Sequence, residues 1–217
     1  MTAPGGRGSP WALSGVFFVA LFIAGLVLSG VLAPAPYPLP GASSAEIMRY
    51  FSEGRTAVLT LGFLQALSAI SLIVFAACVA AFVRGTASGT RTLSWLTLGG
   101  GILAAAFLLL AALLSWVLAL TASEGGAALA GTLHYLIFLA GGPAHVASLA
   151  PFVGAGSVAA LRAKALPRWI SWVGIAAAAI SLLCLVSLIW YPASIFIPLG
   201  RVLSFVWSIA VSVVLIR

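Results

Sequence analysis

One apolar stretch decides the fold of this chain: residues 127–161, AALAGTLHYLIFLAGGPAHVASLAPFVGAGSVAAL. At about 1.5 Å per residue it is longer than the ~30 Å of hydrocarbon in a bilayer, which predicts a membrane-spanning helix. Gly141-Gly142-Pro143 interrupts its middle, and Pro143 predicts a kink because proline lacks the backbone N–H of a regular helix. The stretch also holds both histidines of the chain, His134 and His145, so we expect a polar site here first.

The composition extends this prediction to the whole chain. Of 217 residues, 63% are hydrophobic and only 6% are charged, whereas a soluble domain carries about 25% charged residues. We therefore predict one integral membrane domain over residues 1–217, an all-α polytopic bundle of six transmembrane helices. The predicted spans lie at about 11–31, 56–83, 92–120, 134–161, 169–190 and 198–216.

Two further features lie between the first and second spans. Residues 32–41 contain prolines at positions 34, 36, 38 and 40 and are expected to be extended. Ser43 and Glu46 fit a capping box, which predicts a short amphipathic helix over residues 44–53. We expect this helix to be extracytoplasmic and to lie either flat on the outer face of the membrane or across the mouth of the bundle. The simpler interpretation is a connector that packs its apolar face on the spans.

The charges predict an orientation. Six crossings put both termini on one side, and that side carries seven basic residues and no acid: Arg7, Arg84, Arg91, Arg162, Lys164, Arg168 and Arg217. On the other side, three arginines balance three glutamates: Arg49, Arg55 and Arg201 with Glu46, Glu53 and Glu124. The positive-inside rule places both termini in the cytoplasm. Dividing the 134–161 span at Pro143 would destroy this bias, so a single kinked crossing is predicted.

The two histidines are the first candidates for a ligand site. They lie eleven positions apart, and at roughly 100° per residue a regular helix returns to nearly the same face, which Gly141 and Ser148 continue. An ionisable group at membrane depth marks a functional site by default, and histidine can shuttle protons. Alternatively, both imidazoles are neutral and hydrogen-bond to neighbouring helices. His145 could then complete the backbone hydrogen bonding that Pro143 disrupts.

Gln65 is the most polar uncharged residue in any predicted span, and we expect it to face the bundle. Gly62, Gln65, Ser68 and Ser71 are spaced three residues apart and so share overlapping faces of the helix. This pattern predicts either a polar seam that joins helices or a seam that lines a ligand site.

Arg201 is the last candidate, in the first turn of the sixth predicted span, where a cation opposes the helix dipole. We expect it to reach the lipid head groups or to pair with Glu46, Glu53 or Glu124. Serines 204, 208 and 212 repeat along the same helix and predict a close packing seam.

Known catalytic patterns are missing from the sequence. There is no Asp, and two histidines without nearby carboxylates do not make a zinc hydrolase site. The chain has no phosphate-binding loop, dinucleotide fingerprint or Cys-x-x-Cys pair, and Cys78 and Cys184 are interpreted as small buried apolar groups. The basic residues form no face for nucleic acid. We therefore expect no enzyme, no metal and no cofactor.

Several motifs together resemble a known type of protein. They are LAPAPYP at residues 32–38, the AEIMRYFSEGR helix at 45–55, LH at 133–134 with GGPAH at 141–145, and LPRWI at 166–170. In these the chain is similar to a loosely defined set of bacterial, chiefly actinobacterial, multi-pass membrane proteins of unknown function. The resemblance implies a six-helix fold in the inner membrane and implies no activity, substrate or catalytic residue.

Three functions are compatible with these observations. The first is a non-enzymatic protein that holds a lipid or small apolar ligand in its bundle, with the 44–53 helix as a lid. Its polar contacts would come from His134, His145, Gln65 and Arg201, with Ser148 as a further candidate. The second is a proton-coupled small-molecule carrier that uses the same histidines. The third is a structural subunit of a membrane complex.

Overall fold

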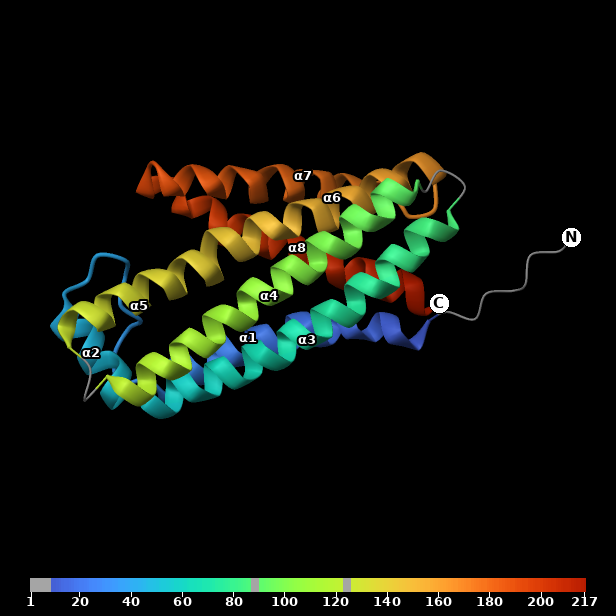
Figure 1. Ribbon diagram of the computed structural model, residues 1–217. Helices are drawn as coiled ribbons and strands as arrows, with labels where there is room; N and C mark the ends of the chain where they lie inside the picture. Colours follow the sequence, from blue (N-terminus) through green and yellow to red (C-terminus); the bar gives the residue numbers. More distant parts are fainter. Residues whose placement is uncertain (1–8, 87–89, 123–125) are drawn as a thin grey trace, which may run out of the picture.

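The structure, a computed structural model, describes residues 9–86, 90–122 and 126–217, and the regular structure of these residues is helical throughout (Figure 1). The helices are α1 (Ser14–Leu32), α2 (Ser44–Glu53), α3 (Arg55–Gly85), α4 (Arg91–Thr121), α5 (Ala127–Leu139), α6 (His145–Ala163), α7 (Arg168–Leu183) and α8 (Phe196–Ile216). Short 3-10 turns precede α1, follow α7 and precede α8, and a π-helical turn, Ala140–Ala144, joins α5 to α6.

Six of the described helical segments are long and apolar enough to cross a bilayer: Pro10–Leu32, Arg55–Gly85, Arg91–Thr121, Ala127–Ala163, Arg168–Leu188 and Tyr191–Ile216. The predicted all-α bundle of a multi-pass membrane protein is confirmed. The fourth of these segments is continuous through Pro143, as a single kinked crossing requires. Many large apolar side chains point outward, among them Phe17, Ile23, Leu103 and Val202, as expected for a surface that contacts lipid.

The six crossings form a ring in chain order. Each span packs against the spans before and after it, and α8 closes the ring on α1, where the contact is the least extensive of the six. The Ser9 N–H donates to the Leu215 carbonyl at 2.9 Å, so the described start and the end of the chain lie together. We call this the terminal end of the bundle. The opposite end, on the left in Figure 1, carries α2 and is called the α2 end.

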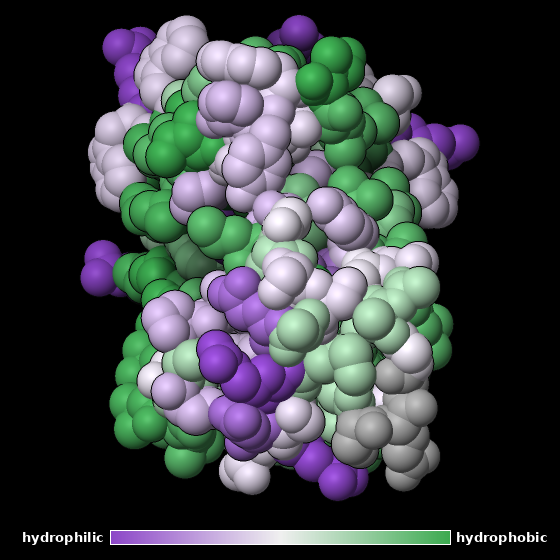
Figure 2. All heavy atoms as spheres, turned by 90° about the vertical axis from the view of Figure 1, so that its left-hand side faces the viewer, coloured by the Kyte–Doolittle hydropathy of each residue, from purple (hydrophilic) through white to green (hydrophobic). Residues whose placement is uncertain are grey.

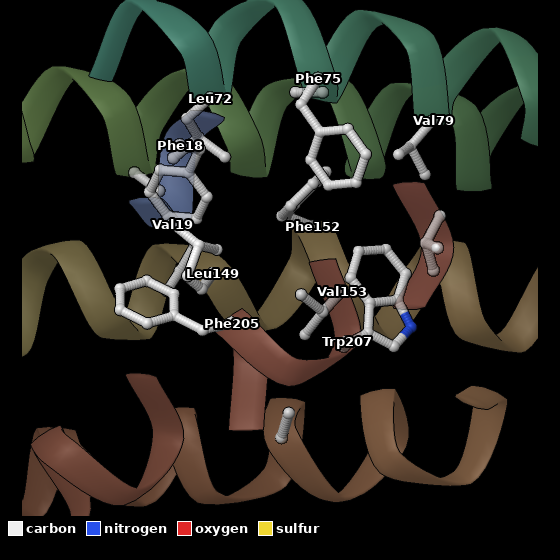
Figure 3. Packing of buried hydrophobic residues seen from close by; sticks show 14 of the residues in the cluster. Phe18, Val19, Leu72, Phe75, Val79, Leu149, Phe152, Val153, Phe205 and Trp207 are labelled. Carbon is white, nitrogen blue, oxygen red and sulfur yellow. The ribbon is translucent and has the colours of Figure 1, made fainter. Parts of the chain in front are cut away.

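The largest cluster of buried apolar residues lies toward the terminal half of the ring and combines aromatic with aliphatic side chains (Figure 3). Phe75 of α3, Phe152 of α6 and Trp207 of α8 contact one another edge to face, with centroids 5.4–6.4 Å apart. Phe18 and Phe22 of α1 contact Phe205 of α8 in the same way at 5.2 and 5.1 Å. These rings join helices that are distant in the sequence and fix how each helix is rotated about its axis.

Side-chain hydroxyls add polar contacts between helices. Ser68 Oγ donates to the Phe18 carbonyl at 2.7 Å, and Ser94 Oγ donates to the Ala80 carbonyl at 2.9 Å. Ser71 instead bonds to its own helix, at the carbonyl of Leu67. Serines 204, 208 and 212 are fully buried on α8, where the sequence predicts a packing seam. The seam from Gln65 to Ser71 therefore joins helices at Ser68.

The α2 helix matches its predicted range of 44–53. Ser43 caps it by accepting a hydrogen bond from the Glu46 N–H at 3.2 Å, and Gly54 ends it. Ile47 and Phe51 on its apolar face are buried against α4 and α5, as the connector interpretation expects. Figure 2 shows the outer surface of this end, where hydrophilic residues gather near the centre and in the half that contains α2, between hydrophobic flanks.

The sixth span begins earlier than the predicted residue 198. A 3-10 turn, Tyr191–Ile195, continues directly into α8, so the crossing starts at Tyr191. Pro198 does not break the helix because it stands in the first turn of α8, where backbone N–H groups have no partner within the helix. Arg201 therefore lies deeper in the bundle than the sequence alone predicts.

The close contact between α4 and α6 depends on Gly100. A Cβ atom there would lie 2.6 Å from the backbone nitrogen of Phe152 and 2.8 Å from Cγ of Pro151, whereas nothing lies within 4 Å of one at Gly99. We predict that Gly100→Leu lowers the free energy of unfolding by ~1–3 kcal/mol through overpacking. Gly99→Leu, the same change one residue away, should leave it near the wild-type value. Thermal melting in detergent checks this, and equal melting temperatures for the two variants would contradict it.

Candidate functional site

The π-helical turn Ala140–Ala144 organises the candidate site. Pro143 cannot donate the backbone hydrogen bond of a regular helix, and the chain widens there by about one residue. One extra residue rotates α6 by about 100° about its axis relative to α5. His134 and His145 therefore do not lie on the same helix face, as a regular helix would place them. His134 lies beside Tyr37 and Phe51, whereas His145 is turned toward α4.

A side chain from another span satisfies a carbonyl of this turn: Arg201 Nη2 donates to the Gly141 carbonyl. Cys184 Sγ lies 3.5 Å from the Pro143 carbonyl, but its single S–H is closer to the Ser181 carbonyl, at 2.8 Å. The guanidinium carbon of Arg201 also stands 5.0 Å from the centre of the Phe22 ring, a cation–π contact. The sequence prediction that His145 completes this backbone is therefore wrong: His145 bonds to the Ala104 carbonyl of α4, and Arg201 completes the Gly141 carbonyl.

Arg201 also has a different environment from the two predicted ones. Phe22 lies ten residues before Leu32, the end of its helix, which at 1.5 Å per residue is about 15 Å, or half of a bilayer's hydrocarbon. A guanidinium at this depth contacts protein groups rather than lipid head groups. Its contacts are a carbonyl and an aromatic ring, not the carboxylates of Glu46 or Glu53, and Glu124 falls outside the described residues.

His145 is a buried helix–helix contact. Its side chain is fully buried, and Nδ1 lies 2.9 Å from the Ala104 carbonyl of α4. Because a carbonyl only accepts hydrogen bonds, Nδ1 carries the proton of the neutral ring, and Nε2 has no partner. Ser148, one turn further along α6, donates to the Ala144 carbonyl at 2.7 Å. Neither residue lines the cavity described next.

A cavity of about 370 Å³ opens at the α2 end and brings three of the candidates together: Gln65 of α3, His134 of α5 and Arg201 of α8. Pockets for small ligands have volumes of about 300–1,000 Å³ and are mostly apolar with a few polar groups. The lining follows that pattern. Its apolar part comes from five helical segments and includes Leu26, Leu61, Ala111, Ile137, Phe138 and Ile197.

His134 is the most enclosed polar residue of the cavity wall. Its side chain is only 1% exposed, and neither ring nitrogen makes a hydrogen bond, although the backbone of Pro38 and Leu39 lies beside it. The ring stacks at a tilt on Tyr37, with centroids 5.6 Å apart, and stands edge to face with Phe51 at 6.1 Å. A buried polar group without a partner is unusual and points to a ligand or water that completes it.

The proline segment, residues 33–43, covers this cavity. Tyr37, Pro38, Leu39 and Pro40 line it, whereas no residue of α2 does within the described part of the chain. The position over the cavity that was predicted for α2 is thus occupied by the segment before it. The four alternating prolines hold the segment in an extended conformation, and this pattern was the feature of the sequence that could have identified it as the cover of the cavity.

Two tyrosines connect the proline segment to α2. The Tyr37 and Tyr50 rings lie 5.3 Å apart in an edge-to-face contact. Burial raises the pKa of the Tyr50 phenol, with the nearby Ser29 hydroxyl opposing the shift. Burial and the neighbouring Tyr50 raise the pKa of Tyr37 as well. Both phenols are therefore uncharged at neutral pH, which suits an apolar cover.

No protein-family model, curated protein or solved structure matches this chain. The similarity to actinobacterial multi-pass membrane proteins stays a prediction from the motifs quoted above.

The two histidines are expected to respond differently to the same substitution. His145→Phe removes the hydrogen bond to Ala104 and should lower the stability by about 0.6–2 kcal/mol, the range for polar contacts between membrane helices. His134→Phe removes no hydrogen bond and should leave stability nearly unchanged while altering ligand binding. Melting in detergent provides the measurement. Destabilisation confined to His134→Phe would overturn this assignment of roles.

Proposed function

We propose that this protein is a non-enzymatic membrane protein that binds a lipid or another small, largely apolar molecule in the cavity at the α2 end. The observation that carries the proposal is the convergence of Gln65, His134 and Arg201 on one otherwise apolar cavity of about 370 Å³. His145 and Ser148 would support the site from α6 without touching the ligand. The proline segment would have to move or bend for a ligand to enter from the α2 side.

A second function is favoured by one observation. His134 combines an unpartnered imidazole with a position on the cavity wall, and histidine exchanges protons near neutral pH. A proton-coupled carrier would use this group to link ligand and proton movement. Reconstituted liposomes separate the two functions, because a carrier shows flux driven by a pH gradient whereas a binding protein shows bound ligand without flux.

The binding function is tested by filling the cavity. A Cβ atom at Gly142 would meet Ile197 and Phe138 at 3.5 and 3.6 Å, which is ordinary contact, so a larger side chain can start there and extend into the cavity. We expect Gly142→Leu to lose most of the lipid that co-purifies with the wild-type protein, as measured by native mass spectrometry. Gly99→Leu, which adds the same group on an exposed helix face, serves as the control. Equal lipid content in all three proteins would count against the cavity.

We also propose that the terminal end faces the cytoplasm of a bacterial cell and the α2 end faces outward. The charge bias supports this: Arg84, Arg91, Arg162, Lys164 and Arg168 stand at the ends of α3, α4, α6 and α7 that lie at the terminal end. Such an excess is typical of cytoplasmic loops.

The orientation is tested by labelling single cysteines in a variant without Cys78 and Cys184. Thr86→Cys and Lys164→Cys should react only after the membrane is permeabilised, whereas Arg49→Cys on α2 should react in intact cells. Labelling of positions 86 and 164 from opposite sides would contradict the six-span topology as well as its direction.

A further inference from the structure

The cavity at the α2 end holds a positive charge without a counter-charge. Arg201 lines it, and the described lining residues include no Asp or Glu. The chain has no Asp and three Glu. Of these, Glu46 and Glu53 border a separate groove between α2 and the proline segment, and Glu124 falls outside the described residues. Charges in the hydrocarbon region are costly and pair with an opposite charge or with backbone carbonyls. Arg201 has one such carbonyl, that of Gly141, and no counter-charge among the described residues of the cavity wall.

The hydrogen bonds of Arg201 leave room for such a partner. A guanidinium has five N–H donors, and here Nη2 bonds to the Gly141 carbonyl while the buried Nε has no partner. The planar fork of arginine matches the two oxygens of a carboxylate or phosphate, and these charged hydrogen bonds are among the strongest that proteins form. The Phe22 ring lies over the guanidinium, with its centroid 5.0 Å from the guanidinium carbon, and Arg201 is one of the residues that line the cavity.

Two more polar groups line the same cavity. His134 is 1% exposed, with its ring beside the backbone of Pro38 and Leu39, and the Gln65 side chain carries an amide donor. The rest of the wall is mostly apolar, and its other polar side chains are Tyr37, Ser115, Tyr191 and Ser194. Leu26 on α1 and Pro198 on α8 border the cavity and are both exposed, at the seam where the ring of helices has its least extensive contact.

Taking the binding function proposed above as given, we infer that the ligand is an amphiphile with an acidic head group. Its carboxylate or phosphate pairs with Arg201, with Gln65 and His134 beside it, and its chain leaves toward the lipid between α1 and α8. The volume of about 370 Å³ holds the head group and the first part of a chain, which is near the lower end for ligand pockets.

The test compares probes that share a chain and differ in charge. Dodecanoic acid, dodecyl phosphate and the neutral dodecanol are titrated into the purified protein in a non-ionic detergent at neutral pH. Apparent Kd values come from the shift in melting temperature followed by intrinsic tryptophan fluorescence. We expect at least one acid to bind about tenfold or more tightly than dodecanol, and the tighter of the two acids identifies carboxylate or phosphate as the preferred group.

Arg201→Gln removes the charge but keeps an amide that can donate to the Gly141 carbonyl, and it should reduce the acid's advantage over dodecanol to about twofold or less. Arg201→Lys should retain part of the advantage, and Arg55→Gln, at the start of α3 and outside the cavity wall, should retain all of it. If Arg201→Gln does not fold, the wild-type comparison of acid and alcohol still decides the question.

The outcomes separate the two proposals. Equal affinity of the wild-type protein for dodecanol and both acids would overturn the acidic ligand while leaving the binding function in place. Absence of binding by all three probes, together with absence of co-purified lipid, would overturn both.

Discussion

Inside a bilayer, a backbone carbonyl that loses its helical partner has no water to replace it. This constraint acts on the fourth crossing, where Pro143 disturbs the hydrogen bonding of a long helix. The chain responds with a π-helical turn, and Arg201, from the last crossing, donates to a carbonyl of that turn. The interruption therefore ties α5 and α6 to α8. It also gives a structural reason for an arginine at membrane depth.

The same turn divides the bundle into two functional halves. On its terminal side, α6 packs tightly against α4 and α8 through Phe152, Trp207 and their neighbours, and His145 adds a hydrogen bond to α4. On its α2 side, α5 leans toward α2, and the space between α5, α3 and α8 is the cavity. The packed core on one side of the turn and the cavity on the other agree with the proposed binding of a molecule from the surrounding lipid.

Arg201 has two roles in this arrangement. Part of its guanidinium completes the kinked helix, and the remainder faces the cavity, so a ligand that pairs with it would also contact the element that fixes the fourth crossing. An acidic ligand would in this way stabilise the bundle at its least packed end, since anything that binds only the folded state adds to its stability. The Tyr37 and Tyr50 pair would then act as a hydrophobic cover that excludes water from the charge.

The sequence by itself determined the crossings, because span length and apolarity are local properties: the six spans, the 44–53 helix with its Ser43 cap and the continuous crossing through Pro143 all follow from short stretches. It also identified the residues that are costly in a membrane, namely Gln65, His134, His145 and Arg201. Only the tertiary structure decided which of them meet. The π-helical turn rotated His145 and Ser148 away from His134, the 3-10 turn at Tyr191–Ile195 placed Arg201 deeper, and the proline segment rather than α2 covered the cavity. The physical reason is that the rotation of each helix about its axis is set by contacts with other helices, such as Gly100 against Phe152, and no local pattern in the sequence contains that information.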